Sequence, residues 1–333
     1  MKRAGNLFED ICDPDNLRLA WIKAKKGKEA KPGVFMYGKN LQRNLNDLRD
    51  QLMIGRPEIG NYHFFTIYEP KERLICAASF PERVLHHAIM NVCHPVFEKY
   101  QIYHSYATRI GKGQYAALNY AKSNQKKYSW FCKLDIRKYF DSIPHALLKQ
   151  QLSLRFKDQR VLDLFEKIID SYESSTGYGL PIGNLTSQYF ANYYLGLADH
   201  YLLEEVKIPA YVRYMDDMVL WHHSKSALLK IQYKFTDYIE KEQQLFCKPP
   251  CINSNDKGLP FLGYVIFPKM VRLNRQSKQR FLMKYKVAEK KIRSEIWSQV
   301  DYARHIVPLI AFTRHAQTEQ LRRNVFNLQP EAD

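Results

Sequence analysis

The sequence predicts an α+β protein in which an antiparallel sheet carries the candidate catalytic residues. One observation is the apolar segment 128–136, which is typical of a strand and contains Asp135 near its end. A second is the pair of apolar segments that flank Asp216 and Asp217, the pattern of a β-hairpin with carboxylates at its turn. Segments with helical spacing lie between these strands, and this order of elements indicates the α+β class.

Apolar periodicity and turn residues place the other elements in order. In the first part of the chain we expect a helix at about 39–54, strands at 63–70 and 73–78 around the charged turn 71–72, a helix from about 83, a glycine-containing loop at 105–113 and a helix after it. After the strand at 128–136 we expect helical structure within 144–172, a turn at 177–184, helices at about 186–206 and 226–244, a strand at 259–267 and helices after 275.

The charge balance favours a polyanionic partner. The 333 residues include 51 Lys and Arg against 34 Asp and Glu, a net charge of +17, together with 23 tyrosines. Residues 269–333 alone hold 14 Lys or Arg and 6 Asp or Glu. Because phosphate neutralisation supplies most non-specific affinity for nucleic acids, this surplus indicates binding to RNA or DNA. A solvated basic surface is the plainer alternative.

The sequence also bears on location and on the thiols. No stretch approaches the apolar length that crosses a bilayer, and no apolar signal core follows the N-terminus. We therefore expect a cytoplasmic protein without a membrane partner. The 6 cysteines lack zinc-ligand spacing, so reduced thiols are expected rather than a structural metal site.

Three aspartates are the strongest candidates for a reactive centre. Asp135 ends one apolar strand, and Asp216 and Asp217 occupy the tip of the predicted hairpin. Adjacent carboxylates repel each other unless water or a cation neutralises them. Phosphoryl transfer uses such a cluster, because carboxylates can hold two divalent ions that clamp the attacking and leaving oxygens. A solvated turn is the alternative, but the apolar strands on each side make an exposed loop an awkward fit.

The order of these segments resembles the reverse transcriptase family almost from end to end. The segments that carry the resemblance are Lys71-Glu-Arg-Leu-Ile, Arg83-Val-Leu-His-His-Ala, Ser105-Tyr-Ala-Thr-Arg-Ile-Gly-Lys-Gly, Lys133-Leu-Asp-Ile-Arg-Lys-Tyr-Phe-Asp-Ser, Tyr214-Met-Asp-Asp and Leu259-Pro-Phe-Leu-Gly-Tyr. The resemblance implies a right-hand polymerase fold with fingers at 1–127, a palm of antiparallel sheet plus helices at 128–267 and a helical thumb at 268–333. It also implies RNA-directed DNA polymerase activity with two Mg²⁺ ions, or with Mn²⁺ in their place.

The resemblance assigns catalytic roles to individual residues. Asp135 and Asp216 are expected to bind the metal ions together with the carbonyl of Ile136, while Asp217 assists. Phe140 is expected to lie under the sugar of the incoming nucleotide and to exclude a ribose 2′-OH. A core aromatic is the alternative for Phe140.

Further residues are expected to bind the substrates. Those expected at the incoming nucleotide are Lys71, Arg73, Phe140, Ile182, Gly183 and Gln188. Arg109 and Lys112 are expected to bind template or triphosphate, with a solvated basic loop as the alternative. Gly183 allows the backbone to approach the nucleotide closely, and Lys248 is a candidate for protonating pyrophosphate, in a motif that departs from the family pattern. The candidates for capping the next helix are Asn184, Thr186 and Ser187.

The segment 182–188 indicates a particular lineage within the reverse transcriptase family. Most reverse transcriptases have Gln-Gly and a later Ser-Pro at the place where this chain has Ile182-Gly183 and Ser187-Gln188. This variant resembles the reverse transcriptases of diversity-generating retroelements, which implies mutagenic retrohoming in a prokaryotic cell or phage-infected host. The chain would copy a template-repeat RNA into adenine-mutated cDNA that diversifies a target gene. Its expected partners are template RNA, primer and cDNA, deoxynucleoside triphosphates and an oligomeric accessory variability protein.

Two other interpretations stay open. The first is a reverse transcriptase of another prokaryotic lineage, such as a retron, a group II intron-like enzyme or a phage-defence enzyme. The variant at 182–188 and the lack of a maturase or endonuclease segment count against it. The second is a catalytically silent RNA-binding protein on the same scaffold, against which the three intact aspartates count.

Overall fold

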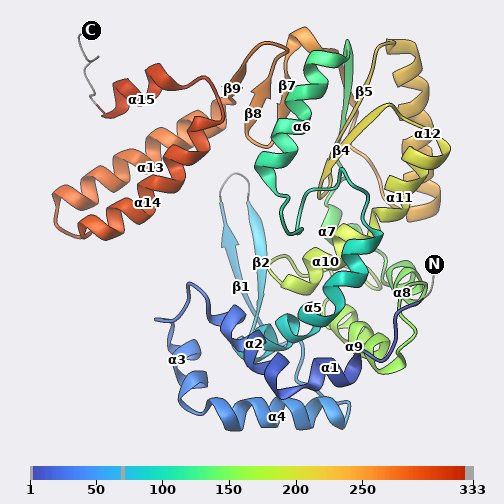
Figure 1. The fold of residues 1–333 in the computed structure, drawn as a ribbon, viewed down its shortest axis with the longest axis vertical. Helices are drawn as coiled ribbons and strands as arrows, with labels where there is room; N and C mark the ends of the chain where they lie inside the picture. The colour runs from blue at the N-terminus through green and yellow to red at the C-terminus, as the bar shows by residue number, and fades with distance from the viewer. Residues whose placement is uncertain (1–2, 69–71, 327–333) are drawn as a thin grey trace. The chain divides into compact units, whose positions relative to one another are not determined.

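The computed structural model describes residues 3–68 and 72–326, and the chain forms two compact units (Figure 1). Unit 1 consists of Met1–Arg109, Ile136–Lys207 and Lys234–Lys248, and unit 2 consists of Ile110–Asp135, Ile208–Tyr233 and Pro249–Asp333. In the described part of the chain, no helix combines the length and the apolar character needed to cross a membrane. The limits of the three predicted subdomains stay a prediction.

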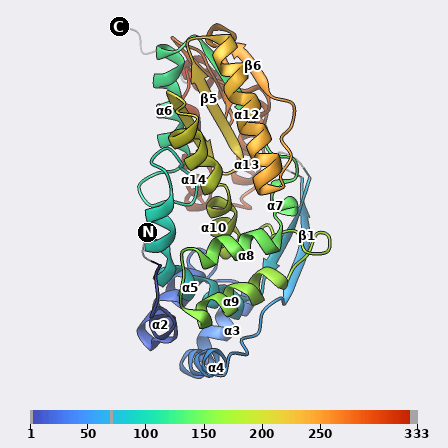
Figure 2. The ribbon, with the colours of Figure 1, turned by 90° about the vertical axis from the view of Figure 1, so that its right-hand side faces the viewer.

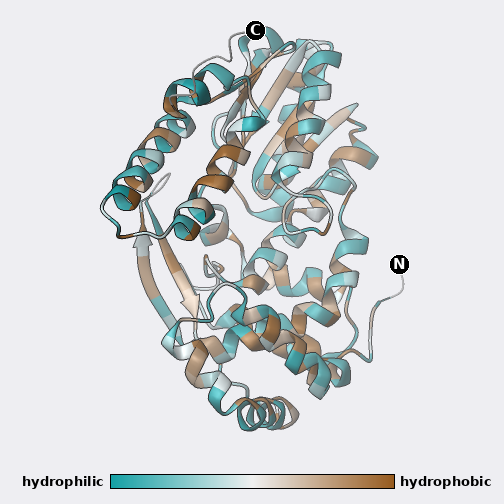
Figure 3. Ribbon diagram, turned by 60° about the vertical axis from the view of Figure 1, so that its left-hand side comes forward, coloured by the Kyte–Doolittle hydropathy of each residue, from teal (hydrophilic) through white to brown (hydrophobic). Residues whose placement is uncertain are grey.

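Unit 1 is mainly helical and contains one β-hairpin. Its elements, in chain order, are α1 (Phe8–Cys12), α2 (Pro14–Lys25), α3 (Pro32–Lys39), α4 (Leu41–Met53), β1 (Tyr62–Ile67), β2 (Arg73–Ala78), α5 (Phe80–Tyr100), α7 (Tyr139–Ser142), α8 (His145–Ser153), α9 (Gln159–Asp170), α10 (Leu185–Tyr194), α11 (Gly196–His200) and the π-helix η1 (Tyr201–Glu205). The amphipathic α4 buries Leu45, Leu48 and Leu52, so it has one brown and one teal side where it is seen end on at the bottom of Figure 3.

Phe97 of α5 lies at the centre of an aromatic core in unit 1. The centroid of its ring is 5.4 Å from that of Phe156 and 5.5 Å from that of Tyr193. Phe165 of α9 lies 5.1 Å from Phe156 and 5.2 Å from Phe190 of α10. Helix α9 also packs beside α8, as both Figure 1 and Figure 2 show. These contacts fix α10, the helix that follows the turn at 177–184, on the rest of the unit.

Unit 2 contains two antiparallel sheets and a group of helices near the C-terminus. Its elements are α6 (Gln114–Lys127), β3 (Trp130–Leu134), β4 (Ala210–Tyr214), β5 (Asp217–His222), β6 (Cys251–Ser254), the 3-10 helix η2 (Asn255–Lys257), β7 (Leu259–Phe261), β8 (Tyr264–Ile266), β9 (Val271–Leu273), α13 (Arg275–Arg293), α14 (Gln299–Arg314) and α15 (Glu319–Phe326). Helix α12 (Lys225–Gln243) begins in unit 2 and ends in unit 1.

The larger sheet has the strand order β4-β5-β3-β6, and the smaller has the order β7-β8-β9. In the larger sheet, Leu134 of β3 pairs with Met218 of β5, and Tyr214 of β4 pairs with Asp217. Trp221 of β5 is fully buried and donates a hydrogen bond from Nε1 to Gln125 Oε1 of α6, at 2.8 Å. The α+β class with an antiparallel sheet and helices is therefore confirmed.

The structure differs from the sequence prediction at 259–267. We expected a single strand there, but β7 and β8 form a hairpin. The turn consists of Leu262 and Gly263, whose φ angles of 49° and 89° lie in the left-handed region. Glycine suits that region but leucine does not, so Leu262-Gly263 is a weaker turn signal than Asn-Gly or Asp-Gly.

Candidate active site

The pairing of β3 with β5 brings two predicted aspartates to the same end of the larger sheet. Lys133 pairs with Val219 and Leu134 with Met218. Extending this register by one residue sets Asp135, which follows β3, opposite Asp217, the first residue of β5. Side chains two residues apart in a strand lie on the same face, so Lys133 shares this face with Asp135 and Asp217.

The β4–β5 turn holds Asp216 at the tip of a hairpin. Tyr214 and Asp217 form the last pair, so Met215 and Asp216 are the two turn residues. Met215 has a φ of 55°, and such a conformation costs a non-glycine residue about 1–2 kcal/mol. The fully buried Arg213 donates from Nη1 to the Met215 carbonyl at 3.2 Å. A strained turn held by a buried guanidinium is typical of a functional site.

Lys133 is the cation beside these carboxylates. Its Nζ lies 3.2 Å from Asp217 Oδ1 and donates to the Pro260 carbonyl at 3.0 Å. Burial raises the pKa of Asp217 to about 6; Lys133 opposes this rise, whereas the charges of Asp216 and Asp135 add to it. The three carboxylates therefore interact electrostatically, and Lys133 offsets only part of the rise in the pKa of Asp217.

The donor chemistry of this cluster fits divalent metal ions. Asp217 Oδ1 is buried, and within the described residues it accepts no hydrogen bond of regular geometry besides its ion pair with Lys133. Carboxylate oxygens are the ligands that Mg²⁺ prefers. Within residues 3–68 and 72–326, however, no group of three or more Asp, Glu, His or Cys side chains converges closely enough to hold an ion as it stands.

In unit 1, the segment 182–184 packs against β2. The Cys76 amide donates to the Ile182 carbonyl at 2.8 Å, and the Ala78 amide donates to Asn184 Oδ1 at 3.0 Å. Gly183 has a φ of 122°, and a Cβ there would lie 2.9 Å from Ile75 Cγ2. The close approach that requires glycine in this structure is therefore to β2.

Asn184 occupies the N-cap position of α10 but makes no side-chain cap there. Its Oδ1 accepts the hydrogen bond from the Ala78 amide of β2 instead. Of the three candidate caps, Asn184 therefore has the N-cap position but does not make the expected hydrogen bond to the start of the helix. Asn184 Nδ2, Thr186 Oγ1 and Ser187 Oγ are buried and have no hydrogen-bond partner in the described part of the chain. Buried polar groups without a hydrogen-bond partner are uncommon in folded proteins, and three of them lie together at the start of α10.

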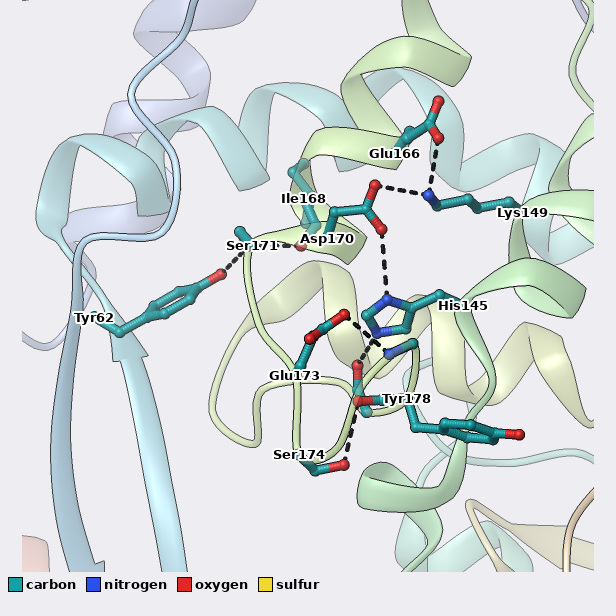
Figure 4. A network of polar contacts seen from close by, with 12 residues as sticks. Tyr62, His145, Lys149, Glu166, Ile168, Asp170, Ser171, Glu173, Ser174 and Tyr178 are labelled. Atoms are coloured by element: carbon teal, nitrogen blue, oxygen red, sulfur yellow. Dashed lines mark hydrogen bonds and ion pairs between the residues drawn. The ribbon is translucent and has the colours of Figure 1, made fainter.

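A polar network holds the loop that leads into this segment (Figure 4). His145 Nε2 lies 2.7 Å from the Gly179 carbonyl, and its Nδ1 lies 3.4 Å from Asp170 Oδ1. Lys149 Nζ lies 2.7 Å from Asp170 Oδ2 and 2.8 Å from Glu166 Oε1. Helices α8 and α9 thus fix the position of Gly179, three residues before Ile182.

Phe140 lies close to the same loop. The Leu180 amide donates to the Phe140 carbonyl at 2.8 Å, and the half-exposed Phe140 ring makes an edge contact with Tyr139 at 5.8 Å between centroids. Gln188 is exposed on the first turns of α10. Arg73 is exposed at the start of β2, two residues before Ile75 and on the same face of the strand. Unit 1 therefore gathers Phe140, the 182–184 segment and β2.

The remaining predicted residues lie elsewhere or are not described. Arg109 is nearly buried, and its guanidinium donates to the Glu98 carboxylate and to the carbonyls of Ile102 and Ser105. Most of its donors are thus used within unit 1. Lys112 is partly exposed in unit 2, and Lys71 lies outside the described residues. The buried Ile136 pairs with Cys247 in unit 1; the roles of all these residues stay predictions.

Residues 69–266 match the family model for reverse transcriptase (RNA-dependent DNA polymerase). The match covers more than half of the chain, and the chain belongs to this family. The predicted membership of the reverse transcriptase family, and with it the right-hand polymerase fold class, is therefore confirmed.

Curated relatives come from intron-encoded proteins. The chain is 25% identical over 217 residues to the COX1/OXI3 intron 1 protein of Saccharomyces cerevisiae, covering 61% of this chain and 26% of that protein. It is 25% identical over 140 residues to the group II intron-encoded protein LtrA of Lactococcus lactis subsp. cremoris, covering 40% of this chain and 23% of LtrA. The chain thus spans about a quarter of the length of these relatives.

Solved telomerase structures show a weaker likeness. Telomerase from Candida albicans in complex with a fragment of telomeric RNA has a TM-score of 0.49 at 10% identity, covering 71% of this chain and 52% of that one. Apo telomerase from Candida tropicalis has a TM-score of 0.47 at 14% identity, covering 65% of this chain and 55% of that one. The family assignment does not depend on these similarities.

Proposed function

We propose that this chain is an RNA-directed DNA polymerase whose reactive centre includes Asp135, Asp216 and Asp217. The observation that carries the proposal is the β3–β5 register, which sets Asp135 opposite Asp217 next to the Asp216 turn. In the reaction, the primer 3′-oxygen attacks the α-phosphorus of a deoxynucleoside triphosphate and loses its proton. The bond from that phosphorus to the bridging oxygen breaks, and pyrophosphate leaves.

Asp135 and Asp216, with the Ile136 carbonyl, are the proposed ligands of two Mg²⁺ ions, and Asp217 assists. Bound ions supply charge neutralisation at the reacting phosphate. Lys133 holds the Asp217 carboxylate in place, and Arg213 fixes the turn that carries Asp216. In unit 1, Arg73, Phe140, Ile182, Gly183 and Gln188 are the proposed nucleotide contacts.

Primer extension on an RNA template with Mg²⁺ tests the proposal. We expect Asp135→Asn and Asp216→Asn each to lower extension by at least about 100-fold, because an amide removes a charge from the metal site. Asp256→Asn is the matched control, since Asp256 is an exposed aspartate of the same unit. Near-normal extension by a well-folded Asp216→Asn protein would overturn the assignment.

We further propose that the enzyme belongs to a diversity-generating retroelement and makes adenine-mutated cDNA from a template-repeat RNA. The support is the Ile182-Gly183 and Ser187-Gln188 variant. An oligomeric accessory variability protein is the proposed partner, so we expect weak extension by the chain alone and stronger extension with that protein. Long, efficient cDNA synthesis without a partner would count against this proposal.

A group II intron-like reverse transcriptase is the second candidate, and the similarity to LtrA and to a yeast intron protein favours it. The two candidates differ in their error spectrum. A retroelement enzyme is expected to misincorporate mainly opposite template adenines, whereas an intron-type enzyme is expected to spread its errors over all four bases. Sequencing cDNA made on one RNA therefore separates them.

A further inference from the structure

Unit 2 contains a cationic hollow that holds none of the predicted site residues. Its volume is about 400 Å³, and its walls come from α6, from the turn between β8 and β9, and from the turn between α14 and α15. Its charged lining residues are Lys122, Lys126, Lys269, Arg314, Glu319 and Arg322. Five cations and one carboxylate therefore face a shared space.

The walls of this hollow are tied together by specific contacts. The Gln317 amide donates to the Val271 carbonyl at 2.8 Å, and the Val271 amide donates to Gln317 Oε1 at 2.6 Å. Lys122 Nζ donates to the His315 carbonyl at 3.2 Å, and the His315 ring stacks on Tyr115 with 3.8 Å between centroids. The cations thus project from a preorganised frame, which lowers the entropy lost when a ligand binds.

The cations of the hollow are not neutralised within the described residues. None of the five forms an ion pair there, and Glu319 is already paired with Arg323, which does not line the hollow. Burial and then Lys126 lower the pKa of Lys122, and burial and then Lys122 lower the pKa of His315. The charges of Lys126 and Lys122 thus add to the effect of burial, and an anion bound here would oppose both pKa shifts.

We propose that this hollow binds the phosphodiester backbone of an RNA segment that is separate from the template–primer duplex. The proposal rests on the proposed function, because a reverse transcriptase binds an RNA template whose other segments can reach a second site. The cations are spread over three elements, a pattern that suits successive phosphates better than one small anion. The Tyr115–His315 stack at the rim adds a flat aromatic surface for an unpaired base.

A charge-matched pair of triple variants tests this site. The hollow variant is Lys126→Gln, Lys269→Gln and Arg314→Gln, three exposed side chains. The control variant is Lys225→Gln, Lys230→Gln and Lys257→Gln, three exposed lysines of unit 2 that do not line the hollow. Binding of a long structured RNA and of a short template–primer hybrid is measured as a function of salt concentration.

The hollow variant should bind the long RNA about 10- to 100-fold more weakly at low salt. Its slope of log affinity against log salt should be shallower by about 2, since each lost phosphate contact removes about 0.7–0.9. Binding and extension of the short hybrid should not change, and the control variant should behave like wild type. Equal losses in both variants would overturn the proposal.

Two competitors separate this site from other anion sites. The proposal would be overturned if the long RNA bound wild type and the hollow variant equally, while a competitor bound only wild type. Such binding by inorganic pyrophosphate would assign the hollow to a free phosphate ligand, and such binding by poly-glutamate would assign it to an acidic protein. These readouts do not require polymerase activity. If wild type binds the long RNA through the hollow but does not extend a primer, that result contradicts only the proposed function.

Discussion

Lys133 Nζ lies 3.2 Å from Asp217 Oδ1, so the proposed catalytic carboxylates have a cation beside them on the same sheet face. A lysine at this point compensates part of the repulsion among three aspartates before any metal binds. Burial nevertheless raises the pKa of Asp217 to about 6, and the charges of Asp216 and Asp135 add to this rise. The ionised Asp217 carboxylate is therefore unfavourable in the metal-free protein at neutral pH, and a bound divalent ion would offset this cost.

Asp217→Asn should therefore stabilise the metal-free protein at pH 8. Between about pH 4 and pH 6 the folded state keeps a proton on Asp217 that the unfolded chain has lost, so stability falls as pH rises through this window. Asparagine cannot ionise and avoids that loss, which amounts to at most about 3 kcal/mol for two pKa units. Thermal unfolding in EDTA should show a higher Tm for the variant at pH 8 and a smaller difference at pH 4.

Two additions complete this experiment. Asp256→Asn replaces an exposed aspartate of the same unit and should change the Tm at neither pH. Mg²⁺ should stabilise wild type more than Asp217→Asn, since ligands that bind only the folded state raise its stability. A variant that unfolds below wild type at pH 8 in EDTA would show that Asp217 stabilises the fold instead.

His145→Ala should raise the KM for deoxynucleotides about 3- to 10-fold with a smaller effect on kcat. The variant removes the contact to the Gly179 carbonyl, and one such hydrogen bond contributes about 0.5–1.5 kcal/mol. The loop before Ile182 would then have to be ordered on binding, which weakens the nucleotide complex. Steady-state kinetics on a homopolymer template measures both constants.

Asp170→Asn should have the same effect in milder form, because Asp170 faces His145 Nδ1 and Lys149. Glu166→Gln is the control, as it leaves the Lys149–Asp170 and His145–Gly179 contacts in place. If all three variants behave like wild type, the network serves only the stability of α8 and α9.

The sequence predicted elements well where the periodicity was long and regular. Strands β3, β4 and β5 are apolar runs within two residues of Asp135, Asp216 or Asp217, and the predicted strands lie within a few residues of the observed ones. Strands β6 and β9 have only four and three residues, too few for a pattern to rise above the surrounding loop. The β7–β8 turn was missed because its first residue, Leu262, adopts a left-handed conformation that leucine seldom takes, and Gly263 alone is a weak turn signal.

Some residues of the candidate site could be predicted from the sequence, and others could not. Asp135, Asp216 and Asp217 could be proposed because each lies beside a recognisable strand. Lys133 and Arg213 could not, since their contacts depend on strand pairing and burial that no local pattern encodes. The close approach of Gly183 to the nucleotide stays a prediction, whereas its close approach to β2 is visible only in the structure.

Phe140→Ala should admit ribonucleotides. The half-exposed ring is proposed to occupy the space of a ribose 2′-OH, and the Phe140 carbonyl, which binds Leu180, stays in place in the variant. Incorporation of one ribonucleotide should improve at least about 10-fold relative to its deoxy counterpart, or about 1.4 kcal/mol. Phe140→Leu, which keeps an apolar side chain, should fall between the two; an unchanged ratio would make Phe140 a core residue.

Ile182→Gln should lower the frequency of errors opposite template adenines. The Ile182 backbone is fixed by the hydrogen bond from Cys76, so the substitution changes the side chain without moving the loop. An apolar branched side chain offers no hydrogen bond to the bases. A mispaired nucleotide is therefore bound only slightly less favourably than a correctly paired one. Because each 1.4 kcal/mol is about tenfold, one added hydrogen bond can change the error frequency several-fold.

Sequencing cDNA from wild type, Ile182→Gln and Ile182→Leu on one RNA rich in all four bases checks this prediction. Ile182→Leu keeps the apolar character and should retain the adenine errors, which separates hydrogen bonding from packing. An unchanged adenine error rate in Ile182→Gln would remove the role of this side chain and leave the retroelement proposal intact. Errors spread evenly over the four bases in wild type would instead end the retroelement proposal and favour the intron-type enzyme, because the adenine bias is what distinguishes them.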